Sequence, residues 1–318
     1  MTFFSIVTPV YNRVDCISRC IESVISQGYE NVEHVIVNDG STDSTFREVL
    51  RYSETDRRVT PVDLEQNRGV GFALNRGIEA ANGDFIILLG SDDFLLPRAL
   101  STINDDVDKF PGFLHYLFVP DDVKKAIAQN PFLNVPQRTI LYRDWLEGSA
   151  KGDFVHVVAR SCFAELKFPE DFRTYEVLNM MRIYRANGKQ LFVNKIVVGR
   201  ERNRKDSVTR EYRLDNISTM ENDYRFTQRF VDWFQADYAR LGVGGLERYL
   251  HRGVLIGIAL RRYADNRLLL SYLPPYNIDT VLLTIANNLH LGPFVYAGVI
   301  AKSKTNRLIE YLGRYLRK

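Results

Sequence analysis

The first hundred residues alternate between short apolar runs and longer segments in which apolar residues recur every three or four positions. Such runs are typical of strands buried on both faces, and the longer spacing is typical of helices with one buried face. We expect strands at residues 3–10, 34–37, 59–64 and 85–89, and helices at residues 14–27, 44–52 and 70–81. This order predicts an α/β protein with a doubly wound, mostly parallel sheet flanked by helices.

Polar residues gather in the loops that follow the predicted strands. These loops are residues 8–13, 38–43, 64–69 and 90–94. Because the carboxyl ends of parallel strands meet at one edge of a sheet, the four loops should converge on a ligand crevice. The last loop contains Asp92 and Asp93, two carboxylates that repel each other unless a cation or a hydrogen-bond donor is present. These residues alone favour a metal site and a helix-capping turn equally.

The pattern becomes less regular beyond Pro97, although strands are still expected at residues 114–119, 154–158 and 190–198. Helical spacing dominates from about residue 211 onward. The predicted helices of that region cover residues 221–241, 247–263, 280–291 and 294–316. We therefore divide the chain into a catalytic domain at 1–210, with halves 1–100 and 101–210, and a mainly helical appendage at 211–318.

Composition and charge exclude several classes of protein. The chain is 45% hydrophobic and 25% charged, as in ordered globular proteins, and its net charge of +3 gives no argument for a nucleic-acid partner. The three cysteines, Cys16, Cys20 and Cys162, form no CxxC pair, so a structural zinc is not expected and the thiols suit a reducing compartment. Because no signal peptide or membrane-spanning run is visible, we expect a cytoplasmic protein, at most attached to a membrane surface.

The C-terminal end is basic. From Lys302 onward it carries six basic residues and one acid, Glu310, interleaved with apolar positions. Ordinary packing, contact with an anionic membrane surface and an oligomer interface are three interpretations of this segment.

Five short motifs in the first hundred residues together resemble a known family. They are Pro9-Val-Tyr-Asn12, Asn38-Asp-Gly-Ser-Thr-Asp43, Asn67-Arg-Gly69, Ala73-Leu-Asn-Arg-Gly77 and Ser91-Asp-Asp93. In this order and spacing they are similar to the N-terminal half of family 2 glycosyltransferases, which have the GT-A fold. The resemblance implies a nucleotide-diphosphate-sugar donor, a Mn²⁺ or Mg²⁺ ion, and inversion at the anomeric carbon.

The resemblance also implies a set of donor-binding residues. They are Pro9, Tyr11, Asn12, Asp39, Arg68, Asp92, Asp93, Arg202 and Arg204. Asp92 matches the second acid of the family's Asp-x-Asp motif and is the expected metal ligand. The chain departs from that motif at Gly90, where the family usually carries the first acid, so two-acid metal binding is in question. Asn38 likewise stands where many relatives have an aspartate.

The same resemblance indicates a catalytic base. Glu176 lies six residues before Arg182, and Gly188 follows after six more, which is the family's spacing for the helix bearing the base. A carboxylate that removes the acceptor's proton contributes a rate factor of roughly 10²–10⁴. Glu170 and Asp171 are alternatives for this role, and a first-turn acid favoured by the helix dipole is the non-catalytic interpretation of Glu176.

These features predict an inverting hexosyl- or N-acetylhexosaminyltransferase. It would move a sugar from a UDP- or GDP-sugar to a glycan or polyprenyl-linked glycan, in bacterial surface polysaccharide synthesis, in the cytoplasm or on the inner face of the plasma membrane. A nucleotidyltransferase would need a basic, glycine-rich first loop, which residues 8–13 lack. A non-catalytic glycan-binding or scaffold subunit with the same fold is the remaining alternative, favoured by Gly90 and by Tyr175 in place of an acid.

Overall fold

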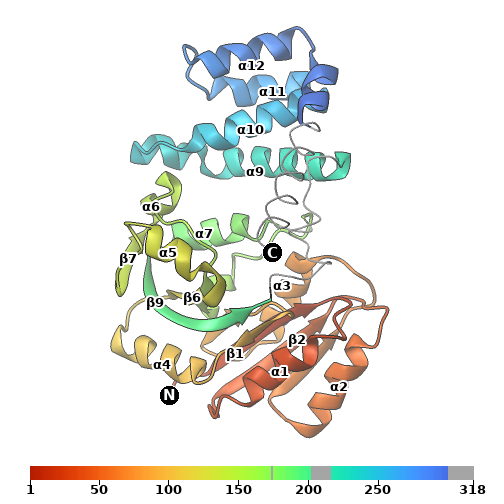
Figure 1. The fold of residues 1–318 in the computed structure, drawn as a ribbon, viewed down its shortest axis with the longest axis vertical. Helices are drawn as coiled ribbons and strands as arrows, with labels where there is room; N and C mark the ends of the chain where they lie inside the picture. The colour runs from red at the N-terminus through yellow and green to blue at the C-terminus, as the bar shows by residue number, and fades with distance from the viewer. Residues whose placement is uncertain (173–174, 202–215, 300–318) are drawn as a thin grey trace, which may run out of the picture. The chain divides into compact units, whose positions relative to one another are not determined.

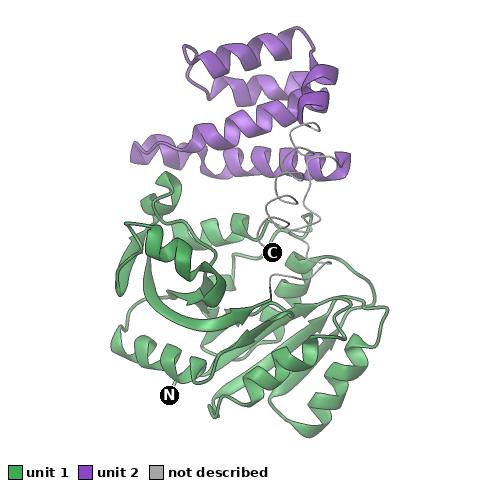
Figure 2. Ribbon diagram, in the orientation of Figure 1, with its two compact units in different colours: residues 1–203 green, residues 204–318 purple. Residues whose placement is uncertain are grey.

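The computed structural model describes residues 1–172, 175–201 and 216–299. The chain forms two compact units, Met1–Asn203 and Arg204–Lys318 (Figure 2). The boundary predicted at residue 210 falls outside the described residues, so its position stays a prediction.

The first unit is built on one mixed sheet (Figure 1). Its described strands run in the order β3-β2-β1-β4-β8-β6-β9-β5, and β7 pairs with β9. Their bounds are β1 Phe4–Val10, β2 Val32–Asn38, β3 Val59–Asp63, β4 Phe85–Leu88, β5 Asp93–Leu95, β6 His115–Pro120, β7 Gln137–Leu141, β8 Val155–Ala159 and β9 Lys189–Arg200. The predicted α/β class and its first four strands are confirmed.

Helices cover both faces of this sheet. The helices of the unit are α1 Ile17–Ile25, α2 Thr45–Thr55, α3 Val70–Ala80, α4 Ala99–Lys109, α5 Lys124–Gln129, α6 Tyr142–Glu147 and α7 Val177–Asn187, with short 3-10 turns η1 Asp121–Val123 and η2 Arg160–Phe163. Apolar residues of α1, α2 and α4 form one core with alternate residues of β1 and β2. On the opposite face Gly77 of α3 lies so close to Val7 and Val37 that a Cβ there would be 2.5 Å from Val7 Cγ1. The sheet is therefore doubly wound, as predicted.

The pairing directions explain where the polar loops go. The pairs β1–β2, β1–β4 and β2–β3 are parallel, so these strands end at one edge. The second half of the sheet is mixed: β4–β8, β6–β8, β5–β9 and β7–β9 are antiparallel, while β6–β9 is parallel. Antiparallel β5 starts at Asp93, which pairs with Arg200 at the end of β9. The loop at residues 90–94, which contains Asp92 and Asp93 and is named the aspartate loop, is thereby fixed to a strand about a hundred residues downstream.

The second unit is helical over its described part. Its helices are α9 Ile217–Leu241, α10 Leu246–Ala259, α11 Tyr263–Ser271 and α12 Ile278–Asn288. Helices α9, α10 and α11 share a core around Tyr224, Leu250 and Val254. One continuous helix was predicted at 247–263, but the chain breaks at Arg261, which has a left-handed φ of 60°. None of the helices in the described ranges is both long and apolar enough to cross a bilayer.

Candidate active site

The first two loops at the carboxyl edge are joined by Asn12. This residue follows β1 with a left-handed φ of 51°, a conformation that asparagine tolerates better than most side chains. Its Oδ1 accepts hydrogen bonds from the N–H groups of Thr42 (2.8 Å) and Asp43 (3.4 Å). Its own N–H donates to Ser41 Oγ at 3.0 Å. The side chain of Asn12 therefore holds the loop at 38–43 in place, whether or not it also contacts a donor.

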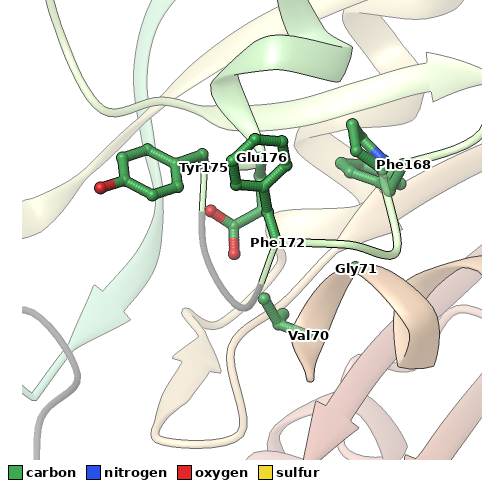
Figure 3. Close-up of a pocket in the computed structure, with 7 residues that line it drawn as sticks. Val70, Gly71, Phe168, Phe172, Tyr175 and Glu176 are labelled. Carbon is green, nitrogen blue, oxygen red and sulfur yellow. The ribbon is translucent and has the colours of Figure 1, made fainter. Parts of the chain in front are cut away.

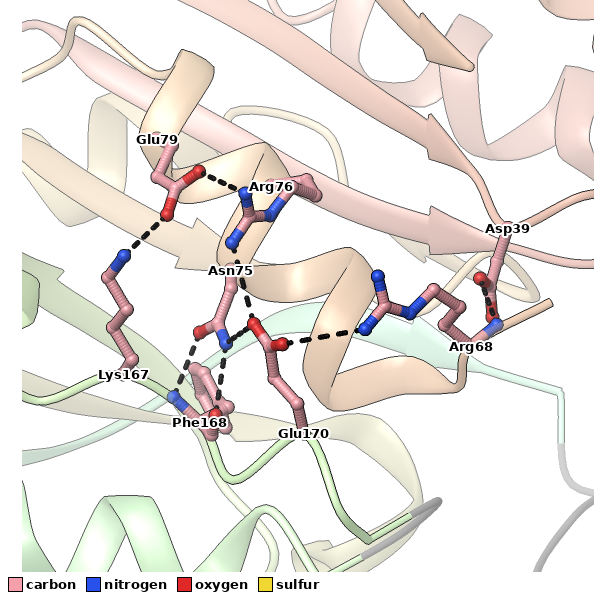
Figure 4. A network of polar contacts seen from close by, with 8 residues as sticks. All are labelled: Asp39, Arg68, Asn75, Arg76, Glu79, Lys167, Phe168 and Glu170. Atoms are coloured by element: carbon pink, nitrogen blue, oxygen red, sulfur yellow. Dashed lines mark hydrogen bonds and ion pairs between the residues drawn. The ribbon is translucent and has the colours of Figure 1, made fainter. Parts of the chain in front are cut away.

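Asp39 ties the second loop to the third. Its buried carboxylate accepts hydrogen bonds from the N–H of Arg68 to Oδ1 and of Gly69 to Oδ2, both at 2.8 Å; Figure 4 draws the first. Gly40 has a left-handed φ of 68°, and a Cβ there would lie 2.6 Å from the backbone carbon of Gln66. Only glycine fits that contact. The Asn-Asp-Gly motif thus builds a rigid pair of loops.

The remaining donor candidates of this half present exposed surfaces. Tyr11 is exposed and Pro9 is partly exposed. The guanidinium of Arg68 lies 3.6 Å from the centroid of the Phe72 ring, and its Nη2 is 4.0 Å from Glu170 Oε2. This stacking orients the guanidinium beside the loop that Asp39 holds.

Side chains at the start of α1 hydrogen-bond to the backbone of the aspartate loop. Arg19 Nη2 donates to the backbone oxygen of Asp92 at 2.8 Å. The thiols of Cys16 and Cys20 contact the backbone oxygens of Ser91 (3.6 Å) and Gly90 (3.7 Å). Burial raises the pKa of Cys20, so its thiol stays protonated and can donate. Cys16 and Cys20 are both buried, and no sequence motif indicates that they support this loop.

Gly90 leaves room between the two carboxylates. A Cβ at residue 90 would lie 3.0 Å from Asp93 Oδ2 and 3.3 Å from Asp92 Oδ1. Two carboxylate oxygens therefore border the space that a side chain at this position would fill. Oxygen ligands of this kind suit a hard divalent cation. Over the described ranges no group of three or more His, Cys, Asp or Glu side chains is arranged to hold a metal, so a cation here would depend mainly on ligands from outside the protein.

Arg200 gathers several acids around the same loop. Its guanidinium is about nine-tenths buried, with Nη1 2.7 Å from Asp153 Oδ2 and Nε 3.6 Å from Asp93 Oδ2. Asp122 Oδ1 lies 3.8 Å from Nη1. The guanidinium of Arg200 is used in these internal ion pairs. Arg202 and Arg204 lie outside the described residues.

Glu176 faces a narrow crevice at the start of α7 (Figure 3). The crevice is lined by Val70, Gly71, Phe168, Pro169, Phe172, Tyr175 and Glu176. The Glu176 carboxylate projects toward Val70 at the start of α3. Burial raises the pKa of this carboxyl, and the negative charge of Asp153 raises it further. A carboxylate with a raised pKa is a stronger base, which suits proton removal near neutral pH.

Two routes connect Glu176 to the donor loops. Asp153 acts electrostatically on Glu176 and pairs with Arg200, which in turn contacts Asp93. On the other side, the crevice includes Val70, the residue after the Gly69 that Asp39 holds. These contacts connect the base candidate to the aspartate loop and to the loop that Asp39 holds. Asp153 was missed from sequence because it stands alone in an irregular stretch, with no motif around it.

The segment preceding Glu176 is fastened to α3 by Asn75 (Figure 4). Asn75 Oδ1 accepts from the N–H of Phe168 (2.8 Å), and its Nδ2 donates to Phe168 O (3.0 Å) and Glu170 Oε1 (2.9 Å). Arg76 Nη2 also lies 3.4 Å from Glu170 Oε1. The carboxylate of Glu170 is therefore bonded to side chains of α3, whereas Asp171 is exposed. This arrangement supports Glu176 over its neighbours as the base.

The fold is that of the GT-A glycosyltransferases. Residues 5–114, about a third of the chain, match the family model for glycosyl transferase family 2, so this part of the chain resembles that family. The first two curated relatives are glycosyltransferases 39% and 35% identical over 108 and 99 residues, which are only 31% and 14% of their own lengths.

Three further proteins resemble a larger part of the chain. GalNAc(5)-diNAcBac-PP-undecaprenol beta-1,3-glucosyltransferase of Campylobacter jejuni is 27% identical over 214 residues, covering 66% of this chain and 68% of that protein. Staphylococcus aureus TarS 1-349 in complex with UDP-GlcNAc superposes with a TM-score of 0.63 at 16% identity, covering 96% and 92% of the two chains. Mannosyltransferase PcManGT of Pyrobaculum calidifontis in complex with GDP-Man and Mn²⁺ has a TM-score of 0.55 at 16% identity, covering 95% and 87%. At these identities the two structures support the fold.

Proposed function

We propose that this protein is an inverting glycosyltransferase that moves a hexose or N-acetylhexosamine from a UDP- or GDP-sugar to a hydroxyl of a glycan or lipid-linked glycan. The observation that carries the proposal is the partly buried Glu176 carboxylate, linked through Asp153 and Arg200 to the aspartate loop. A base on one side and a diphosphate-binding loop on the other is the arrangement that in-line displacement needs.

The donor end of the proposed reaction rests on the first three loops. Asp39 fixes the backbone of Arg68 and Gly69, so the nucleotide meets a preformed surface that includes Tyr11 as a stacking face. Arg68, stacked on Phe72, supplies a permanent positive charge near the phosphates.

Asp92, with Asp93 beside it, would hold the divalent cation in the space that Gly90 leaves. When bound, Mn²⁺ or Mg²⁺ supplies positive charge that stabilises the leaving nucleotide diphosphate. The Mn²⁺ complex of PcManGT supports a divalent cation for this fold. The protein's own residues keep Asp92 in place, since Arg19, Cys16 and Cys20 all bind the backbone of this loop.

At the acceptor end, Glu176 removes the proton of the attacking hydroxyl as the new bond forms. Its raised pKa increases its basicity, and the apolar walls of the crevice limit the access of water. The lipid-linked glycan in the name of the Campylobacter relative supports a lipid-linked glycan as the acceptor. Bacterial surface polysaccharide synthesis is the setting we propose.

Calorimetric titration with UDP- and GDP-sugars, with and without Mn²⁺, tests the donor proposal. We expect metal-dependent binding of one of them; no metal-dependent binding at millimolar concentration would leave the non-catalytic scaffold as the better interpretation.

Glu176→Gln tests the base. Transfer should fall by about 10²–10⁴ while donor affinity is unchanged. Glu170→Gln and Asp171→Asn are matched controls; if one of them abolishes transfer and Glu176→Gln does not, the base belongs to that residue instead.

A further inference from the structure

Helix α12 buries polar residues and leaves a stripe of apolar residues exposed, although Leu283 and Ala286 pack against the core. Its buried residues include Thr280 and Asn287, and Asn287 hydrogen-bonds to Asn266 of α11 (3.2 Å) and to the backbone of Tyr263 (3.1 Å). Its exposed residues include Asp279 and Asn288, but most of them are apolar. The exposed apolar residues are Ile278, Val281, Leu282 and Ile285, continued by Leu289 at the end of the helix.

These apolar residues form one continuous stripe. At 3.6 residues per turn, positions 278, 281, 282, 285 and 289 fall within an arc of roughly 100°, opposite Thr280 and Asn287. Beside the stripe, an open groove of about 360 Å³ between α11 and α12 includes Leu270, Leu273 and Pro275. A contiguous exposed apolar surface of this kind marks an interaction site.

Large aromatic residues flank the stripe. Tyr276, just before α12, is 97% exposed, and Phe294, just after it, is also strongly exposed. Residues 268–299 contain one Asp, Glu, Lys or Arg side chain, Asp279, and one histidine, His290, so the surface is nearly free of charge. Exposed aromatic residues at the ends of an apolar helix face are typical of segments that lie in the headgroup region of a bilayer.

Charge separates a lipid surface from a second copy of the chain. Directly after the apolar region, residues 302–318 contain six basic residues and one acid. A second copy of the chain carries the same basic sequence and therefore offers it no complementary charge. An anionic bilayer is complementary to both features, because it accepts apolar side chains and attracts basic ones.

We propose that the exposed face of α12, with Tyr276 and Phe294, binds the surface of an anionic membrane. We name this surface, made of Tyr276, Ile278, Val281, Leu282, Ile285, Leu289 and Phe294, the α12 face. The assignment of a biological role to it rests on the proposed function, since a lipid-linked acceptor would reach the protein at such a surface. The helix lies on the bilayer; its 11 residues are too few to span it.

Vesicle co-sedimentation of the full chain tests this proposal. The protein should bind vesicles of phosphatidylcholine with phosphatidylglycerol, bind vesicles of phosphatidylcholine alone less, and be released by salt. The double variant Leu282→Gln/Ile285→Gln should reduce binding to anionic vesicles at least tenfold. Both side chains are about half exposed (57% and 47%), so the fold should tolerate the change.

The matched control is Leu114→Gln/Leu141→Gln, which changes two leucines of the first unit with similar exposure (48% and 46%) and should bind like the wild type. A second variant, Tyr276→Ser/Phe294→Ser, removes the aromatic residues outside α12 and should also weaken binding. Equal binding by wild type and both α12-face variants would overturn the proposal. The proposal would also be overturned if vesicles bound no protein and analytical ultracentrifugation showed a dimer that Leu282→Gln/Ile285→Gln dissociates.

Nucleotide-sugar titration of the same variants separates this proposal from the proposed function. Donor binding should be unchanged in the α12-face variants. Loss of vesicle binding with intact donor binding supports the membrane face, and absent donor binding in the wild type refutes the transferase while the vesicle result stands.

Discussion

The hydrogen bonds of Asn75 allow a quantitative test of how the two halves of the first unit are joined. Asn75 is buried on α3 and satisfies both peptide groups of Phe168, itself a buried residue. Asn75→Leu keeps the branched skeleton of the side chain but cannot bond to either group, and the larger methyl groups leave no space for a replacement water. An unsatisfied buried peptide group costs about 1–3 kcal/mol, so losing both should lower the free energy of unfolding by about 2–6 kcal/mol.

The first unit can be followed alone by fluorescence. The chain has two tryptophans, Trp145 in the first unit and Trp233 in the second. In a Trp233→Phe background, Trp145 reports only on the unit that contains the site, and it stacks on Tyr184 with centroids 4.1 Å apart, so its emission should change on unfolding. Urea unfolding of this protein gives the free energy that the prediction concerns.

Asn82→Leu in the same background is the control. Asn82 is exposed just after α3, and its side chain bonds to Glu33 and to the backbone of Ala80. A surface change of this kind should cost about 0.5 kcal/mol or less. If Asn75→Leu cost no more than Asn82→Leu, other contacts would hold the segment before Glu176. If Asn75→Leu lowers the free energy of unfolding as predicted, the molecules of this variant that remain folded should also show reduced turnover with unchanged donor affinity.

Three further predictions concern stability and pH. Burial lowers the pKa of His156 to about 4 and of His34 to about 3, so on acidification these histidines become protonated in the unfolded chain before they do so in the folded protein. The free energy of unfolding should therefore fall as the pH drops below about 6.5, by about 2 kcal/mol per histidine at pH 5. Urea unfolding at about pH 6.5 and at pH 5 measures this difference. The raised pKa of Glu176 gives the opposite pH dependence of stability, because the folded protein is destabilised when this carboxyl ionises. Glu176→Gln should therefore raise the melting temperature at pH 8, and this gain should vanish as the pH falls toward 4.5. Gly40→Ala should lower the melting temperature and weaken donor binding, because its Cβ would meet the backbone of Gln66 at 2.6 Å; an unchanged melting temperature would contradict the close loop contact.

The parallel half of the sheet could be predicted from sequence because its signals are local. Each buried strand is an apolar run, each helix has its own period, and the loop motifs lie directly after the strands. The strands β5 and β7 could not be found in this way. Residues Asp93–Leu95 are too few to show a pattern, and they form a strand because β9 offers them a partner.

The same distinction applies to the candidate site. Asp39, Asp92 and Glu176 stand in motifs or at helix ends, where a sequence pattern indicates them. Asp153 and Arg200 acquire their positions from pairings across the sheet, and the hydrogen bonds of Asn75 to Phe168 span 93 residues. No periodicity or spacing records such contacts, because they depend on how separate elements pack.

Arg200 and Gly90 together bear on how the proposed site would take up a cation. Since residue 90 carries no carboxylate, Asp93 is the acid nearest to Asp92 in the loop, and its Oδ2 already faces the nine-tenths-buried guanidinium of Arg200. Arg200 in turn binds Asp153, whose charge raises the pKa of Glu176. A cation drawing on Asp93 would therefore compete with Arg200, and any change in the Arg200–Asp153 pair would alter the field at the base. On this reasoning the donor loop and the proposed base are coupled electrostatically through Arg200 and Asp153, without a direct contact between them.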